Sequence, residues 1–333
     1  MRKRVLNIVV SLIVAVLFIW LAVKNVDLNE LWSEISGVSL YWLPPFLLVL
    51  LISHYLRAER WRLLLLNDQK KVQRSTLFAG VMMGYMVNNL LPRVGEITRP
   101  VYVAKKAGLS SSNLIGTIVI ERLFDVATML ILIFLSAAYL ISDLTTVERL
   151  LGVDGWPWYV YLSIPAFFVF IAISIYAAYR VLLMLEGQKK IKSRLLLKIV
   201  EKARSFSEGI LSIRYIKNWP LFLLFTAGIW VGYIIMTYLP FYMMNLQAVY
   251  GLTISDAVVL TMVSSIGVSI PTPAGIGSYH LLIQQSMSLL YSVPLVTALT
   301  YATVAHAITI LTVFLTTPIA LWWDKYYTLK HPV

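Results

Sequence analysis

Long runs of apolar residues, separated by short polar and charged segments, dominate the chain. A helix of about 20 residues crosses the roughly 30 Å hydrocarbon core of a bilayer. Six runs are long enough to do so, at residues 5–23, 41–56, 115–141, 156–185, 219–244 and 295–323. The second is short and contains Pro44 and Pro45, so its end is the least defined, and it can continue through 61–66. The pattern predicts six transmembrane helices, the first an uncleaved signal anchor.

Two further apolar runs, 77–91 and 257–270, are too short to span a bilayer and end in breaks rich in proline and glycine. After each break the chain turns back, through 96–106 and 278–291 respectively. Irregular backbone at membrane depth is tolerated where it is buried in protein or lines a cavity. We therefore expect two opposed re-entrant helical hairpins. Their tips contain Pro92, Gly95, Pro273, Gly275 and Gly277.

The order of these elements indicates an internal repeat within a single transmembrane domain covering residues 1–333. Each half, 1–142 and 156–323, has two spans, a broken hairpin and a third span. Three spans are an odd number, so the second half enters the membrane with the opposite orientation. Inverted repeats whose broken helices meet near the midplane are typical of transporters. The expected fold is an all-α polytopic membrane protein with this symmetry.

Composition and charge placement agree with a membrane protein. Hydrophobic residues make up 59% of the chain and charged residues only 13%, whereas about 25% is usual for soluble domains. The absence of cysteine excludes disulfide scaffolds, thiolate-ligated zinc and iron–sulfur clusters. No metal-ligand spacing or nucleic-acid-binding motif accompanies the net charge of +12, so we expect no cofactor, no metal and no nucleic acid partner.

Lysine and arginine alternate between the two sides of the predicted topology. Segments 57–74 and 186–218 hold six and nine of them, while 24–39 and 142–155 are acidic. The positive-inside rule then places both termini in the cytoplasm. We expect the membrane to be a bacterial or archaeal plasma (inner) membrane. Segment 186–218 also carries apolar residues, which favours an amphipathic helix on anionic lipid headgroups over a solvated basic loop. His54, close to this boundary, is expected to be interfacial.

Charged residues inside apolar sequence are the main functional signal, because an ionisable group in a membrane is costly unless it is paired or hydrated. Two alternatives remain open for them, and both can hold at once. They form an internal salt-bridge network, or they line a cavity where arginines hold phosphate or carboxylate oxygens. In the second half, polar residues follow the glycine-rich tip, and His280 and His306 fit ligand groups, proton carriers or core histidines. The candidate substrate-binding residues are Arg93, Glu96, Arg99, Glu121, Arg122, Asp125, Tyr279, His280 and Gln284.

Segments 88–96, 121–125 and 273–277, together with Arg99, resemble the signature segments of the lysylphosphatidylglycerol synthase transmembrane-region family. The resemblance implies a flippase-like integral membrane protein. In the bifunctional members a cytosolic domain aminoacylates phosphatidylglycerol, and lipid translocation is assigned to the membrane domain. The chain ends at Val333, so we expect a stand-alone membrane domain. Ala274 and His280 stand where the family often has glycine and an acidic residue, which argues against carrying over specificity for a lysyl lipid.

The function that fits these features is movement of a phospholipid or lipid-linked headgroup between leaflets through a polar midplane site. Three arginines against three carboxylates leave the sign of the substrate open. No catalytic motif is recognisable, so we expect a transporter with membrane lipids as partners; a homo-oligomer is compatible with it. Two alternatives remain. One is an integral-membrane lipid-modifying transferase or hydrolase using Glu121, Asp125, His280 or His306, and the other is a structural partner of a cell-envelope machine.

Overall fold

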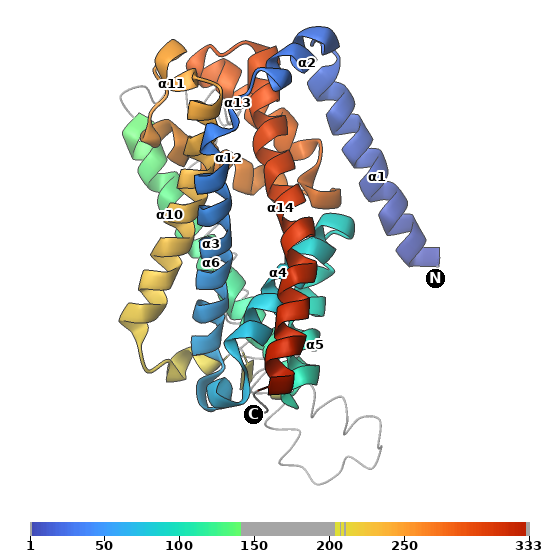
Figure 1. Cartoon of the computed structure of the whole chain (residues 1–333), viewed down its shortest axis with the longest axis vertical. Helices are drawn as coiled ribbons and strands as arrows, with labels where there is room; N and C mark the ends of the chain where they lie inside the picture. The colour runs from blue at the N-terminus through green and yellow to red at the C-terminus, as the bar shows by residue number, and fades with distance from the viewer. Residues whose placement is uncertain (1, 141–203, 207, 210, 331–333) are drawn as a thin grey trace, which may run out of the picture.

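The computed structural model describes residues 2–140, 204–206, 208–209 and 211–330, and all regular structure in them is helical (Figure 1). The α-helices are α1 (Arg2–Val23), α2 (Leu28–Ser36), α3 (Leu43–Leu64), α4 (Arg74–Leu90), α5 (Gly95–Ala107), α6 (Ser111–Leu140), α10 (Trp219–Met243), α11 (Leu246–Val249), α12 (Ile254–Ser269), α13 (Ser278–Tyr291) and α14 (Leu295–Lys330). The short 3₁₀ helices are η1 (Leu40–Trp42), η2 (Leu66–Lys71), η4 (Ser212–Tyr215) and η5 (Pro273–Gly275). The expected all-α class is thus confirmed for this part of the chain.

Helices occupy five of the six predicted apolar runs. The sixth, 156–185, lies outside the described residues, as do 142–155 and most of 186–218. By length and composition, three helical stretches in the described part can cross a membrane: Leu40–Leu64, α10 and α14. A fourth is added if α1 and α2, which meet at an 89° bend, count as one broken span.

The second run forms a longer helix than its apolar stretch alone suggested. Pro44 and Pro45 stand in the first turn of α3, where a missing backbone N–H costs nothing, and the helix continues to Leu64. It therefore carries Arg57 and Arg60, from a segment assigned to the cytoplasm, into the buried part of the protein.

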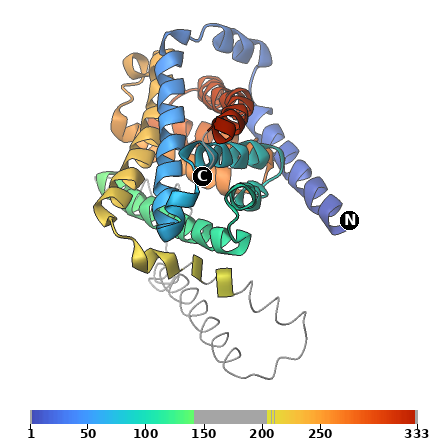
Figure 2. The ribbon, with the colours of Figure 1, turned by 60° about the horizontal axis from the view of Figure 1, so that its bottom comes forward.

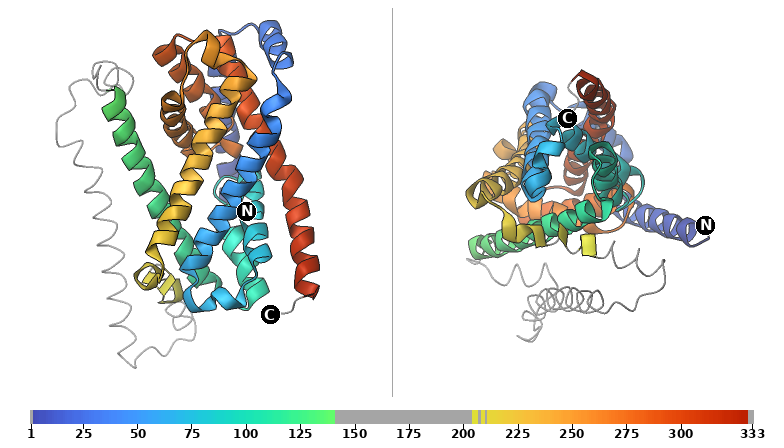
Figure 3. Two further views of the ribbon diagram at one scale, coloured as in Figure 1. Left: turned by 60° about the vertical axis from the view of Figure 1, so that its left-hand side comes forward. Right: turned by 90° about the horizontal axis from the view of Figure 1, so that it is seen from below.

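Two neighbouring helix pairs make up much of the bundle, and one of them includes α4 of the first hairpin. α10 lies along α3 and α14 lies along α4, as Figures 1 and 3 show. One apolar core forms around Trp61, Leu77 and Phe222 beside the first hairpin. A second forms around Phe241 and Tyr301 beside the second hairpin. Each hairpin thus has its own core.

Helix α1 stands at the side of the bundle and packs on α13 and η5 (Figures 1 and 2). Gly277 has φ +87°, and a Cβ there would lie only 2.7 Å from the Ala15 carbonyl oxygen. Gln284 Nε2 donates to the Ala22 carbonyl at 2.9 Å. These contacts dock α1 onto the second hairpin.

Both predicted hairpins are helix–break–helix units: α4 packs on α5, and α12 packs on α13. Their breaks meet, because η5 contacts α4 and Arg93 Nη2 donates to the Ser269 carbonyl at 3.3 Å. Arg93 and Ala274 have φ values of +65° and +54°, a left-handed conformation that is uncommon for non-glycine residues. Residues in sparsely populated backbone conformations cluster at functional sites. The junction of the two breaks is therefore a candidate site.

Candidate functional site

Glu121, on α6, is the centre of a buried ion-pair network. Its side chain is fully buried, and its Oε1 lies 2.5 Å from Arg57 Nη1 and 3.4 Å from Arg60 Nη2. Arg99, on α5, donates from Nη1 and Nη2 to the two carboxylate oxygens at 3.2 and 3.0 Å. The Arg99 guanidinium also lies 4.1 Å from the centre of the Trp61 ring. Charge-assisted hydrogen bonds of this kind fix the helices relative to one another.

Asp125 stands one turn after Glu121 and shares two of its partners. Its Oδ1 accepts from Arg60 Nη2 at 2.7 Å and its Oδ2 from Arg57 Nη1 at 3.0 Å. Arg57 Nη2 in turn donates to the Tyr233 hydroxyl at 2.9 Å. The network therefore connects α3, α6 and α10.

Sequence reasoning missed Arg57 and Arg60, because they belong to a run of basic residues that reads as a cytoplasmic loop. Their spacing carried a usable signal. Arg57, Arg60 and Trp61 recur at three- and four-residue intervals, as residues on one face of a continuing helix do.

Arg122 forms a second, more open ion pair. Its Nη2 lies 2.8 Å from Glu96 Oε1, and its Nε donates to Glu96 Oε2 at 3.1 Å. The Arg122 and Glu96 side chains are 41% and 31% exposed, in contrast to the fully buried Glu121. Of the two pairings, this one is accessible to a ligand.

A cavity of about 600 Å³ adjoins this pair and lies between the two breaks. Of the predicted residues it is lined by Pro92, Arg93, Glu96, Arg122, Asp125, Gly275 and Tyr279. Helices α3, α4, α6, α10, α12 and α14 contribute the rest of its wall. The two breaks and α6 therefore meet at one cavity, whose wall carries charged and hydroxyl side chains.

The remaining predicted site residues do not line the cavity. Arg99 and Glu121 lie in the buried network behind it. Gln284 and Gly277 hold α1 in place, and a Cβ at Gly95 would overlap the Gly84 carbonyl. These glycines of the tips serve close packing.

The last two predicted site residues are Pro273 and His280, which lie beside the cavity wall. Pro273 opens η5, and the His280 ring lies 5.1 Å from the His306 ring. His306 itself lines the cavity, and its Nε2 lies 2.9 Å from the Ala274 carbonyl oxygen.

Aromatic, hydroxyl and aliphatic side chains make up the rest of the cavity wall. His54 is buried and stacks on Tyr85 with 4.2 Å between ring centres. His54 was expected at the membrane interface, and the structure places it inside the protein, in the cavity wall. The hydroxyl residues of this wall are Thr237, Thr261, Ser264, Ser265, Ser269, Thr272 and Thr309. In the described part of the chain, no group of three or more histidine and carboxylate side chains is placed to hold a metal ion.

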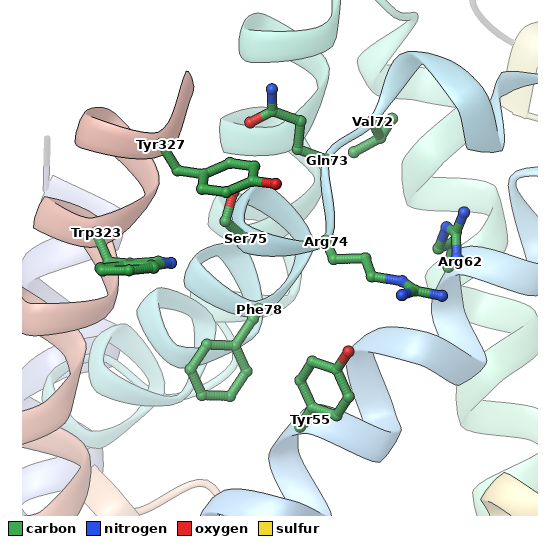
Figure 4. Close-up of a pocket in the computed structure, with 9 residues that line it drawn as sticks. All are labelled: Tyr55, Arg62, Val72, Gln73, Arg74, Ser75, Phe78, Trp323 and Tyr327. Carbon is green, nitrogen blue, oxygen red and sulfur yellow. The ribbon is translucent and has the colours of Figure 1, made fainter. Parts of the chain in front are cut away.

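A second groove, of about 630 Å³, lies apart from the central cavity near the C-terminal end of α14 (Figure 4). Aromatic side chains including Tyr55 and Trp323 surround it. Arg74 and Arg62 enter it, and both pair with Glu59, at 3.0 and 3.5 Å. Arg74 is therefore an arginine outside the central cavity that can serve as a control for Arg93.

Comparison with known proteins gives a consistent result. Over 156 residues the chain is 24% identical to the UPF0104 membrane protein MJ1595 of Methanocaldococcus jannaschii, a match covering 45% of this chain and 46% of that protein. The chain thus spans about half the length of the curated relative it matches. No solved structure matches it. The family described as the lysylphosphatidylglycerol synthase TM region matches residues 8–316, nearly the whole chain. The protein therefore belongs to this family of multi-pass integral membrane proteins.

Proposed function

We propose that this protein moves a phospholipid or a lipid-linked headgroup between the two leaflets of a cell membrane. The observation that carries the proposal is the cavity between the two hairpin breaks, with charged and hydroxyl side chains and the accessible Arg122–Glu96 pair in its wall. A headgroup that crosses hydrocarbon needs polar partners along its path, since unpaired polar groups are costly there. The acyl chains stay in lipid while the headgroup passes through the cavity.

In the proposed architecture six spans and two re-entrant hairpins form an inverted repeat of residues 1–142 and 156–323. The contacts between the breaks at Arg93 and Ser269 support it, because opposed broken helices that meet at the midplane are typical of secondary transporters. The buried network around Glu121 would then hold the helices in place during transport. The exposed Arg122–Glu96 pair would open to bind the headgroup and re-form after its release.

The proposal requires leaflet exchange without covalent change of the lipid. Purified protein in liposomes should increase the rate at which a headgroup-labelled phospholipid becomes accessible to an impermeant quencher, relative to liposomes without protein. Mass spectrometry of the same lipids should show no new species. A changed lipid mass would indicate a lipid-modifying enzyme instead, and neither exchange nor modification would favour a structural partner of the envelope.

The orientation follows from the positive-inside rule, with both termini and segment 186–218 in the cytoplasm. Cysteine labelling tests it without background, since the chain has no cysteine. Lys71→Cys, at a side chain 62% exposed, should be protected from an impermeant thiol reagent in intact cells. Glu30→Cys, at an exposed position on α2, should be labelled. The reverse pattern would contradict the proposed topology.

A further inference from the structure

We infer that the headgroup bound in the central cavity is a phosphate attached to an uncharged, hydroxyl-bearing group such as glycerol or a sugar. A headgroup with a cationic aminoacyl substituent does not fit. This inference rests on the proposed function and specifies its substrate.

The first argument is the charge of the cavity and of the network behind it. Five guanidinium groups face three carboxylates, so the formal charge is +2. The arginines are Arg57, Arg60, Arg93, Arg99 and Arg122, and the carboxylates are Glu96, Glu121 and Asp125. Each of these carboxylates is already paired with at least one arginine. Arg57 and Arg60, which only the folded structure places in this site, thus make its net charge positive. The sequence had left the charge of the substrate open.

Arg93 is the cation with the least compensation. Its Nη2 donates to a backbone carbonyl, and no carboxylate of the described residues lies within ion-pair distance of it. Arg122, the other arginine reaching the cavity with substantial exposure, pairs with Glu96 at 2.8 Å and with Asp125 at 3.5 Å. Two guanidinium groups lining one cavity suit a phosphate, whose oxygens accept forked hydrogen bonds. A lysyl ammonium would meet this excess of positive charge without a free carboxylate, which is unfavourable in a low-dielectric site.

The second argument is the hydrogen-bonding capacity of the hydroxyl and aromatic side chains that line the cavity. Ser264, Ser265 and Thr309 donate their own hydroxyl protons to carbonyl oxygens of their helices, at 2.8 to 2.9 Å. Their oxygens therefore remain able to accept. Conversely, Trp230 and His54 are among the residues that line the cavity, and both are more than nine-tenths buried. Trp230 Nε1 and both ring nitrogens of His54 have no hydrogen-bond partner.

A wall with both spare acceptors and spare ring nitrogens suits hydroxyl groups, because each hydroxyl donates one hydrogen bond and accepts others. The aromatic faces of Trp230 and Tyr279 add apolar surface against which a glycerol or sugar can pack. The phosphate and the hydroxyl groups would thus bind to different side chains of one cavity.

Binding to the purified full chain in detergent tests the inference with three short-chain lipids of equal acyl length. Phosphatidylglycerol carries the phosphate and the hydroxyls, phosphatidic acid only the phosphate, and lysyl-phosphatidylglycerol the added cation. From the rise in melting temperature with lipid concentration, we expect phosphatidylglycerol to bind at least about tenfold more tightly than either of the others.

Two variants separate the two parts of the site. Arg93→Gln should weaken phosphatidylglycerol and phosphatidic acid alike. Trp230→Phe should weaken phosphatidylglycerol while leaving phosphatidic acid unchanged. Arg74→Gln, in the groove of Figure 4, is the matched control and should change neither affinity.

Lysyl-phosphatidylglycerol binding as tightly as phosphatidylglycerol would overturn the inference, and so would an absence of binding by all three lipids. Equal affinity for phosphatidic acid and phosphatidylglycerol would overturn the hydroxyl part. The leaflet-exchange assay separates this inference from the proposed function. Binding of phosphatidylglycerol without leaflet exchange would refute the proposed translocation but not the inferred headgroup. Preferred exchange of lysyl-phosphatidylglycerol would support translocation and refute the inferred headgroup.

Discussion

Replacing Glu121 by glutamine is expected to destabilise the protein by about 3–5 kcal/mol, because breaking a buried ion pair leaves uncompensated charge behind. The Glu121 carboxylate is fully buried and contacts Arg57, Arg60 and Arg99. Without it, three guanidinium groups from two helices share only Asp125, which already pairs with two of them. The loss should be measured as a fall of several degrees in the melting temperature of the detergent-solubilised protein.

Arg122→Gln is the matched control, since Arg122 is the next residue and its side chain is 41% exposed to the cavity. It should change the melting temperature little while abolishing leaflet exchange. Glu121→Gln with wild-type thermal stability would contradict the bracing role of the network. Equal loss of stability in both variants would show that Arg122 also holds the helices in place.

Leucine at Gly275 is expected to reduce leaflet exchange by at least about tenfold, which corresponds to about 1.4 kcal/mol in the barrier. Gly275 lines the cavity, and a Cβ there would lie 3.2 Å from Val268 Cα and 3.3 Å from its Cγ2. A larger side chain must therefore displace the end of α12 or extend into the path of the headgroup. The exchange rate should be compared in liposomes with equal amounts of folded protein.

Gly251→Leu controls for backbone strain. Gly251 and Gly275 have φ values of +68° and +75°, so a side chain at either position bears a similar left-handed penalty of about 1–2 kcal/mol. A Cβ at Gly251 meets nothing within 4 Å, and the exchange rate of this variant should stay near wild type. Normal exchange in Gly275→Leu would show that the break serves only helix packing.

Much of the fold could be predicted because its signals are local. Runs of apolar residues at membrane length predicted the helices, and the Pro/Gly breaks predicted where α4 and α12 end. Both features depend on neighbours within a few turns, so one sequence suffices to recognise them. The charged residues Glu96, Arg122 and Asp125 stood out for the same reason, as rare charges in apolar sequence.

The sequence by itself thus determined the helical class, the position of both breaks and four of the charged residues at the cavity, Arg93, Glu96, Arg122 and Asp125. Only the tertiary structure decided which side chains face it. Glu121 and Arg122 are adjacent, yet about 100° of rotation per residue sends one into the buried network and the other to the cavity. Arg57 and Arg60 enter the site because α3 continues beyond its apolar stretch and packs beside α6. Their spacing shows that they share a helix face, but the partner helix is set by a long-range contact. These two arginines set the charge of the site.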